Sequence, residues 1–132
     1  MSAGGLDLGL VIVNWNVRDL LAGCLDSVYL DLAQSGLRAR VCVVDNGSGD
    51  GSAEMVRRQF PRTLLVEAEN HGMGAGNNLG LRTLAAQDPF FAYLILNPDT
   101  VVRPGALRAL VDCLRRRPRA GVAGRRRAGG GG

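Results

Sequence analysis

Four short apolar segments alternate with segments of helical periodicity, and this alternation constrains the fold more than any other feature of the chain. The apolar segments cover residues 8–13, 40–44, 63–66 and 90–96. Apolar side chains recur at helical spacing from about Asn16 to Gly36, over 53–60, after Asn78, and from Pro104 to Pro118. Strands joined through helices form parallel sheets with right-handed crossovers. We therefore expect an α/β protein with three α/β/α layers and a mainly parallel sheet.

Local signals predict where some of these elements begin and how they are buried. Asn16 is suited to cap the first helix, because Asp19 follows three positions later, and Asp50 or Ser52 is suited to cap the second. The last apolar segment carries no charge, so it predicts a strand that is buried on both faces. A Gly-rich segment, 69–78, is predicted to be a loop that approaches a ligand closely through its glycines.

The length of 132 residues suits one domain, which we assign to residues 1–124, with 120–124 as a candidate fifth strand. Residues 125–132 contain arginine, alanine and glycine only, and are predicted to be a disordered tail. Residues 115–132 hold seven of the sixteen arginines and no acid, so residues 1–114 have a formal charge of −3 although the whole chain has +4. Without interleaved aromatic residues, this basic end favours a solvated tail over a nucleic-acid site.

Several classes of protein are disfavoured by the sequence. The three cysteines have no paired spacing, so we expect reduced thiols and neither a disulfide framework nor a zinc site. We expect no secretory signal peptide and no transmembrane segment. These features predict a cytoplasmic protein, with a peripheral position at the inner membrane face as the alternative.

Polar residues follow the predicted strands at the edge where open α/β sheets bind ligands. Asp99 offers a carboxylate for Mg²⁺ or Mn²⁺ beside a diphosphate, and Asn97 could hold a ribose hydroxyl or a metal-bound water. Asp45 could accept a hydrogen bond from the ring imide of a pyrimidine base. Both segments also have a purely local interpretation, because Asn, Asp and Pro are common in turns. Trp15 could stack on a base or pack beneath the first loop.

Four motifs in order resemble the inverting family 2 glycosyltransferases with the GT-A fold, particularly the rhamnosyltransferase-like branch. They lie at residues 11–16, 43–52, 69–82 and 96–100. The resemblance implies a Rossmann-like half that binds a UDP- or dTDP-sugar with a divalent metal, for cell-wall or polysaccharide biosynthesis. It implies base recognition by Asp45 and metal binding by Asp99. The implied nucleotide-sugar site also contains Val13, Asn14, Asn46, Gly72, Asn78 and Asn97.

The resemblance also implies a catalytic base, for which the sequence has no matching residue. In this family an acceptor half supplies the carboxylate that deprotonates the acceptor hydroxyl, whereas no carboxylate side chain follows Asp112 here. We therefore assign no catalytic residue and expect little or no sugar transfer by the isolated chain. The alternatives are a truncated, non-catalytic nucleotide-binding module and a basic-tailed nucleic-acid-binding protein. Apolar surface left exposed would favour self-association or a partner chain.

Overall fold

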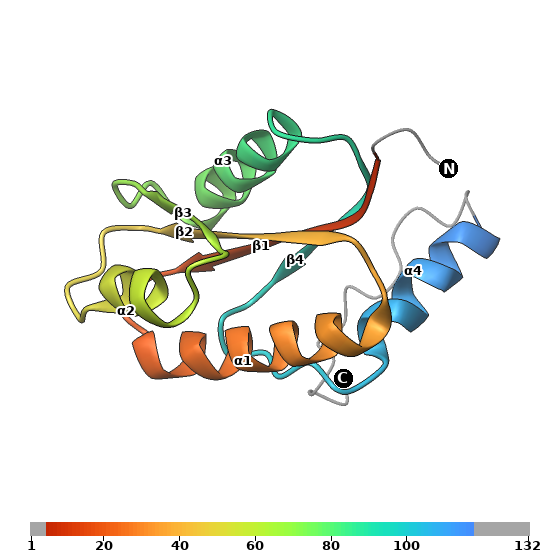
Figure 1. Ribbon diagram of the computed structural model, residues 1–132. Helices are drawn as coiled ribbons and strands as arrows, with labels where there is room; N and C mark the ends of the chain where they lie inside the picture. Colours follow the sequence, from red (N-terminus) through yellow and green to blue (C-terminus); the bar gives the residue numbers. More distant parts are fainter. Residues whose placement is uncertain (1–4, 118–132) are drawn as a thin grey trace.

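Residues 5–117 are described by the structure, which is a computed structural model (Figure 1). Four strands and four helices alternate along them. In chain order these are β1 (Leu6–Asn14), α1 (Arg18–Ser35), β2 (Ala39–Asp45), α2 (Ser52–Gln59), β3 (Leu64–Glu67), α3 (Met73–Ala85), β4 (Phe90–Leu96) and α4 (Ala106–Arg116). The alternation predicted from apolar periodicity is thus confirmed, with element bounds shifted by a few residues.

The strands form one parallel sheet in the order β3-β2-β1-β4. Strand β1 lies inside the sheet, which is why its last seven residues are all buried. Helices α1, α2 and α4 pack against one face through residues such as Leu10, Ile12 and Leu25, and α3 covers the other face over Val11 and Val44. Figure 1 shows α3 above the sheet and α1 below it. The predicted three-layer α/β/α fold with a parallel sheet is therefore confirmed.

Helix α3 begins earlier than the sequence predicted. The segment 69–78 was expected to be a loop, but residues 73–78 form the first turns of the helix. Of its three glycines, only Gly72 has a positive φ, at 96°. Gly76 and Gly80 instead bring the helix close to β1: a Cβ atom at Gly80 would lie 2.5 Å from the Val11 Cγ1 atom. These two glycines are therefore explained by helix packing and not by loop flexibility.

Strand β4 is an edge strand, and the prediction that both of its faces are buried is wrong. Leu94 and Leu96 are buried against the α1 layer, whereas Phe91, Tyr93 and Ile95 are each about 40% exposed on the opposite face. The reason is topological, because α3 lies over β1 and β2 and leaves this face of the edge strand largely uncovered. Within residues 5–117, β4 therefore presents an apolar stripe along a strand edge that no other described strand pairs with.

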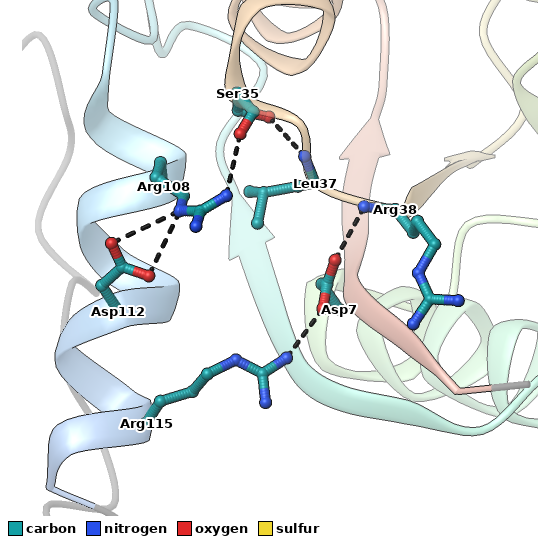
Figure 2. Close-up of polar contacts among 7 residues, drawn as sticks. All are labelled: Asp7, Ser35, Leu37, Arg38, Arg108, Asp112 and Arg115. Atoms are coloured by element: carbon teal, nitrogen blue, oxygen red, sulfur yellow. Dashed lines mark hydrogen bonds and ion pairs between the residues drawn. The ribbon is translucent and has the colours of Figure 1, made fainter. Parts of the chain in front are cut away.

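Helix α4 is fixed to the sheet layer by polar contacts from distant residues. The buried carboxylate of Asp31, on α1, accepts hydrogen bonds from the backbone N–H groups of Gly105 and Leu107 and so caps the helix. Further along α4, Arg115 donates to Asp7 over 2.7 Å, and Arg108 donates to the Ser35 carbonyl over 3.0 Å (Figure 2). These contacts hold α4 against α1 and β1.

Three further sequence predictions concern the cysteines, membrane-spanning segments and the C-terminal residues. The cysteines are free thiols, as predicted, and burial raises the pKa of Cys42 to about 11. No helix within residues 5–117 has the length and apolar character to cross a membrane. The proposed fifth strand at 120–124 and the tail at 125–132 lie outside the described residues, so the domain boundary stays a prediction.

Candidate functional site

The candidate site lies at the carboxyl edge of the parallel sheet, where polar residues follow three neighbouring strands. Asn14 at the end of β1 pairs in register with Asp45 at the end of β2. On the other side of β1, the last pair with β4 is Ile12 with Leu96, just before Asn97. Segments that are 31 or more residues apart in sequence therefore meet at one edge of the sheet, as the strand assignments predicted.

Asn14 and Asp45 form a buried polar pair at the centre of this edge. The Asn14 Nδ2 atom donates to Asp45 Oδ1 over 3.0 Å, and the two residues are 0% and 3% exposed. Ser48 joins them: its hydroxyl donates to Asp45 Oδ1 over 2.7 Å, and its backbone N–H donates to Asp45 Oδ2 over 3.1 Å. The carboxylate is thereby held in one orientation by charge-assisted hydrogen bonds.

The Asn14 side chain leaves one buried acceptor unused. Its Oδ1 atom is inaccessible to solvent and has no hydrogen-bond partner within residues 5–117. The orientation of the amide is set by its neighbour, because only the Nδ2 group can face the Asp45 carboxylate favourably. Buried polar atoms in folded proteins are almost always paired, so this oxygen is suited to accept a donor from a water or a bound molecule.

The loop after β2 is tied to the loop after β1 and to two helix starts. Asn16 has a positive φ of 56°, and its Oδ1 atom accepts from the Gly49 N–H over 2.8 Å, so the prediction that Asn16 caps α1 is wrong. Asp50 has that role instead: its carboxylate accepts from the N–H groups of Arg18 on α1 and Ser52 on α2. The Ser52 side-chain hydrogen bond is the main reason why the pKa of Asp50 is below its ordinary value.

The remaining predicted nucleotide residues occupy different environments around this pair. The Val13 side chain is buried under α3, where a Cβ atom at Gly76 would lie 2.8 Å from its Cγ1 atom. Asn46 is buried, and its Nδ2 atom lies 3.5 Å from the Gly72 carbonyl, which connects β2 to the start of α3. Asn78 is exposed on α3. The fold thus gathers Val13, Asn46 and Gly72 around the central pair, while Asn78 projects from the covering helix.

Residues Asn97–Thr100 form a turn directly after β4. The Thr100 N–H donates to the Asn97 carbonyl over 3.0 Å, and the side chains of Asn97 and Asp99 are exposed. The local turn interpretation is therefore correct, and it presents both polar side chains at the sheet edge. Cys24, on α1, lies behind the turn: burial, and then the charge of Asp99, raises the pKa of its thiol to about 12.

Asp99 fits a metal ion only if a ligand supplies the remaining coordination. Within the described part of the chain, no three His, Cys, Asp or Glu side chains lie close enough to hold a metal by themselves. Mg²⁺ and similar ions are commonly bound by one or two carboxylates together with phosphate oxygens and water. One exposed carboxylate at the edge of the sheet meets this requirement for a metal that arrives with a diphosphate.

The spacing of the strands sets the distance between the two parts of the site. Asp45 is the last residue of β2 and Asp99 follows β4, and these strands are separated by β1. Neighbouring strands lie about 4.8 Å apart, so the ends of β2 and β4 are separated by roughly 10 Å across the sheet. Trp15, which is 54% exposed, lies beside this edge and does not pack beneath the first loop.

Comparisons with known proteins agree with this arrangement. The model of the glycosyl transferase family 2 matches residues 10–132. The chain belongs to glycosyl transferase family 2. The family predicted by resemblance is therefore confirmed, and the polar residues at the sheet edge lie within the matched region.

Two curated proteins illustrate this membership. The family 2 chain is 32% identical over 108 residues to the succinoglycan biosynthesis protein ExoO of Rhizobium meliloti, covering 80% of this chain and 29% of that protein. It is 34% identical over 92 residues to the N-acetylglucosaminyl-diphospho-decaprenol L-rhamnosyltransferase of Mycobacterium tuberculosis, covering 64% of this chain and 30% of that protein. The chain thus spans about three tenths of the length of these relatives.

Solved structures give the same fold for this family 2 chain. The mannosyltransferase PcManGT of Pyrobaculum calidifontis, determined in complex with GDP-Man and Mn²⁺, matches with a TM-score of 0.67 and 25% identity, over 85% of this chain and 34% of that one. S. aureus TarS 1-349, determined with UDP-GlcNAc, matches in fold with a TM-score of 0.64 and 18% identity, over 84% of this chain and 32% of that one. The predicted GT-A, Rossmann-like architecture is confirmed by these matches.

Ser48 was the main residue that sequence reasoning missed. It lies within the motif at residues 43–52 and was assigned no role, although Asp and Ser are both residues that form local side-chain hydrogen bonds in turns. Its contacts with Asn14 and Asn16 had no sequence signal, because they join residues 32 or more positions apart.

Proposed function

We propose that this family 2 chain binds a nucleoside diphosphate sugar at the carboxyl edge of its sheet, for inverting transfer of the sugar to an acceptor hydroxyl. The observation that carries the proposal is the buried Asn14–Asp45 pair at adjacent strand ends, because it fixes an acceptor-only carboxylate at the ligand-binding edge of a family 2 fold. The complex of PcManGT with GDP-Man and Mn²⁺ supports a nucleotide-sugar ligand with a metal.

The base is recognised in this proposal by the Asp45 carboxylate. A carboxylate can only accept hydrogen bonds, so it pairs with the imide N–H of uracil, thymine or guanine and repels the unprotonated ring nitrogen of cytosine. A UDP- or dTDP-sugar is the donor expected from the family resemblance, and a GDP-sugar would meet the same hydrogen-bonding requirement. Val13, Asn14, Asn46 and Gly72 surround the base and ribose, and Asn78 contacts the nucleotide from α3.

The diphosphate is bound in this proposal on the β4 side of the site. Asp99 would hold Mg²⁺ or Mn²⁺ together with phosphate oxygens, and Asn97 would hold a ribose hydroxyl or a metal-bound water. When it is bound, the metal neutralises charge on the diphosphate leaving group. The separation of roughly 10 Å between the strand ends allows a nucleoside to extend from Asp45 to the diphosphate beside Asp99.

The biological setting is proposed from the relatives. Their printed names include succinoglycan biosynthesis and rhamnosyl transfer, so we infer a role in polysaccharide or cell-wall synthesis. The cytoplasmic location and the peripheral position at the inner membrane face stay predictions. The exposed stripe of Phe91, Tyr93 and Ile95 supports self-association of the 132-residue chain through β4, with a second copy as the occupant.

Calorimetric titration of the 132-residue chain with UDP and dTDP, with and without Mn²⁺, tests the proposal. We expect binding that Mn²⁺ strengthens, and loss of this strengthening in Asp99→Ala. Asp26→Ala is the matched control, because Asp26 is an exposed carboxylate on α1. Absence of nucleotide binding by the wild-type chain would refute the proposed function, and an unchanged Mn²⁺ effect in Asp99→Ala would refute the metal assignment alone.

Assays of donor hydrolysis and sugar transfer then separate binding from turnover. We expect the 132-residue chain to bind the donor and to transfer little or no sugar, because no residue of the chain is assigned as the base. Sustained transfer to an acceptor would show that this expectation is wrong while leaving the nucleotide site intact.

A further inference from the structure

Ser48 lies at the centre of the polar network that holds Asp45. Its hydroxyl donates to Asp45 Oδ1 over 2.7 Å and accepts from the Asn16 N–H over 2.8 Å and from Asn14 Nδ2 over 3.3 Å. Its own N–H donates to Asp45 Oδ2 over 3.1 Å. A hydroxyl has one proton, and two N–H groups already point at this oxygen, so the proton is directed to Asp45. Ser48 is thereby bonded to both oxygens of the carboxylate.

The distribution of these donors distinguishes the two carboxylate oxygens. Oδ1 accepts from Asn14 Nδ2 and from the Ser48 hydroxyl, so both lone-pair directions of Oδ1 are used. Oδ2 accepts from the Ser48 N–H as its one donor within the described residues, so one direction remains. The acceptor that Asp45 can offer to a ligand is therefore on Oδ2.

We propose that Ser48 is a positioning residue that sets base specificity, by holding Asp45 so that Oδ2 presents an acceptor to the imide N–H of the base. This inference rests on the proposed nucleotide-sugar function and adds to it the residue that determines which bases are accepted. A ligand of the uracil, thymine or guanine type supplies the required N–H, whereas cytosine presents a lone pair to the same oxygen.

The contacts of Ser48 also make it a structural link between the loops after β1 and β2, and the two roles predict different results. If Ser48 only links the loops, its replacement should lower the stability of the fold and weaken the binding of all nucleotides equally. If Ser48 positions Asp45, its replacement should change the preference between bases. The carboxylate without its hydroxyl donor can then rotate and use either oxygen. The ratio of UDP to CDP affinity therefore separates positioning from loop linkage.

The experiment measures UDP and CDP binding in the presence of Mn²⁺ for the 132-residue wild type, Ser48→Ala, Ser48→Cys and Ser48→Thr. We expect Ser48→Ala to weaken UDP binding roughly ten-fold while CDP binding stays nearly unchanged. Ser48→Thr keeps the hydroxyl and should restore the wild-type ratio. Ser48→Cys keeps the size of the side chain but donates weakly, so it should lose the preference even if Ser48→Ala does not fold.

Ser35→Ala is the control variant, because Ser35 also bonds to its local backbone but lies at the end of α1, far from the sheet edge. It should leave both affinities unchanged. A folded Ser48→Cys or Ser48→Ala variant with the wild-type UDP:CDP ratio would overturn the inference while the proposed function stands. A wild-type chain that binds neither nucleotide would overturn both.

Discussion

Substitution of Gly80 by alanine tests how closely α3 approaches β1. A Cβ atom at this position would lie 2.5 Å from Val11 Cγ1 and 3.3 Å from Val44 Cγ2. Favourable contacts between carbon atoms begin at about 3.5 Å, so the first distance is short by about 1 Å. Val11 is 0% exposed and β-branched, and it has little freedom to move away.

Two opposing effects decide whether Gly80→Ala raises or lowers the free energy of unfolding. Alanine is favoured over glycine in a helix by about 1 kcal/mol, whereas overpacking a buried site costs about 1–3 kcal/mol. With an overlap of this size we take the upper part of that range, so Gly80→Ala should lower the free energy of unfolding by about 2 kcal/mol. For a domain of this length that corresponds to a fall in Tm of about 8 °C.

Urea and thermal unfolding followed by circular dichroism measure this change. Gly74→Ala is the matched control, because it lies in the same helix and its Cβ atom would have no described neighbour within 4 Å. That variant should be as stable as the wild type, or more stable by up to about 1 kcal/mol. The close approach of α3 to β1 would be refuted if Gly80→Ala were also neutral or stabilising.

Two further predictions concern pH and association. The lowered pKa of Asp50 means that its ionised form stabilises the folded state at pH values above the ordinary carboxyl pKa, and that this contribution is lost as the pH falls below about 4. Asp50→Asn should therefore be less stable than the wild type near pH 7, and the difference in stability should shrink on acidification. A difference in stability that is independent of pH would contradict this. Asp26→Asn, at an exposed carboxylate, serves as the control. Light scattering should detect self-association of the 132-residue chain and its loss in Ile95→Lys, since a charge on an edge strand opposes pairing, whereas Leu30→Lys on α1 should still associate. A wild-type chain that stays monomeric at high concentration would argue against the β4 contact.

The fold could be predicted because its signals are local. Apolar runs and helical spacing identified the four strands and four helices of residues 5–117, and the residues that follow the strands were expected at one sheet edge. The same reasoning failed at Gly76, which was predicted to lie in a loop, and it assigned no role to Gly80. In a sequence, a glycine is compatible both with a flexible loop and with close helix packing. Only the position of Val11 and Val13 beneath α3 explains these glycines.

The candidate site was predicted in its composition but not in its connections. Asp45 and Asp99 were recognised because each follows an apolar strand. The hydrogen bonds that orient Asp45 come from Asn14, at the end of β1, and from Ser48, in the loop after β2. Likewise, Asp50 bonds to the first residues of both α1 and α2, although the sequence suggested it only for the second of these helices.

The alternation of strands and helices, the parallel sheet and the polar character of its carboxyl edge could be predicted, because each depends on residue types within a few positions of one another. Which strand lies at the edge, and which side chains meet, depends on long-range packing. Strand β4 is apolar throughout, yet one of its faces is exposed because α3 packs over β1 and β2. Burial and hydrogen bonding depend on neighbours from distant parts of the chain, and only the fold brings those neighbours together.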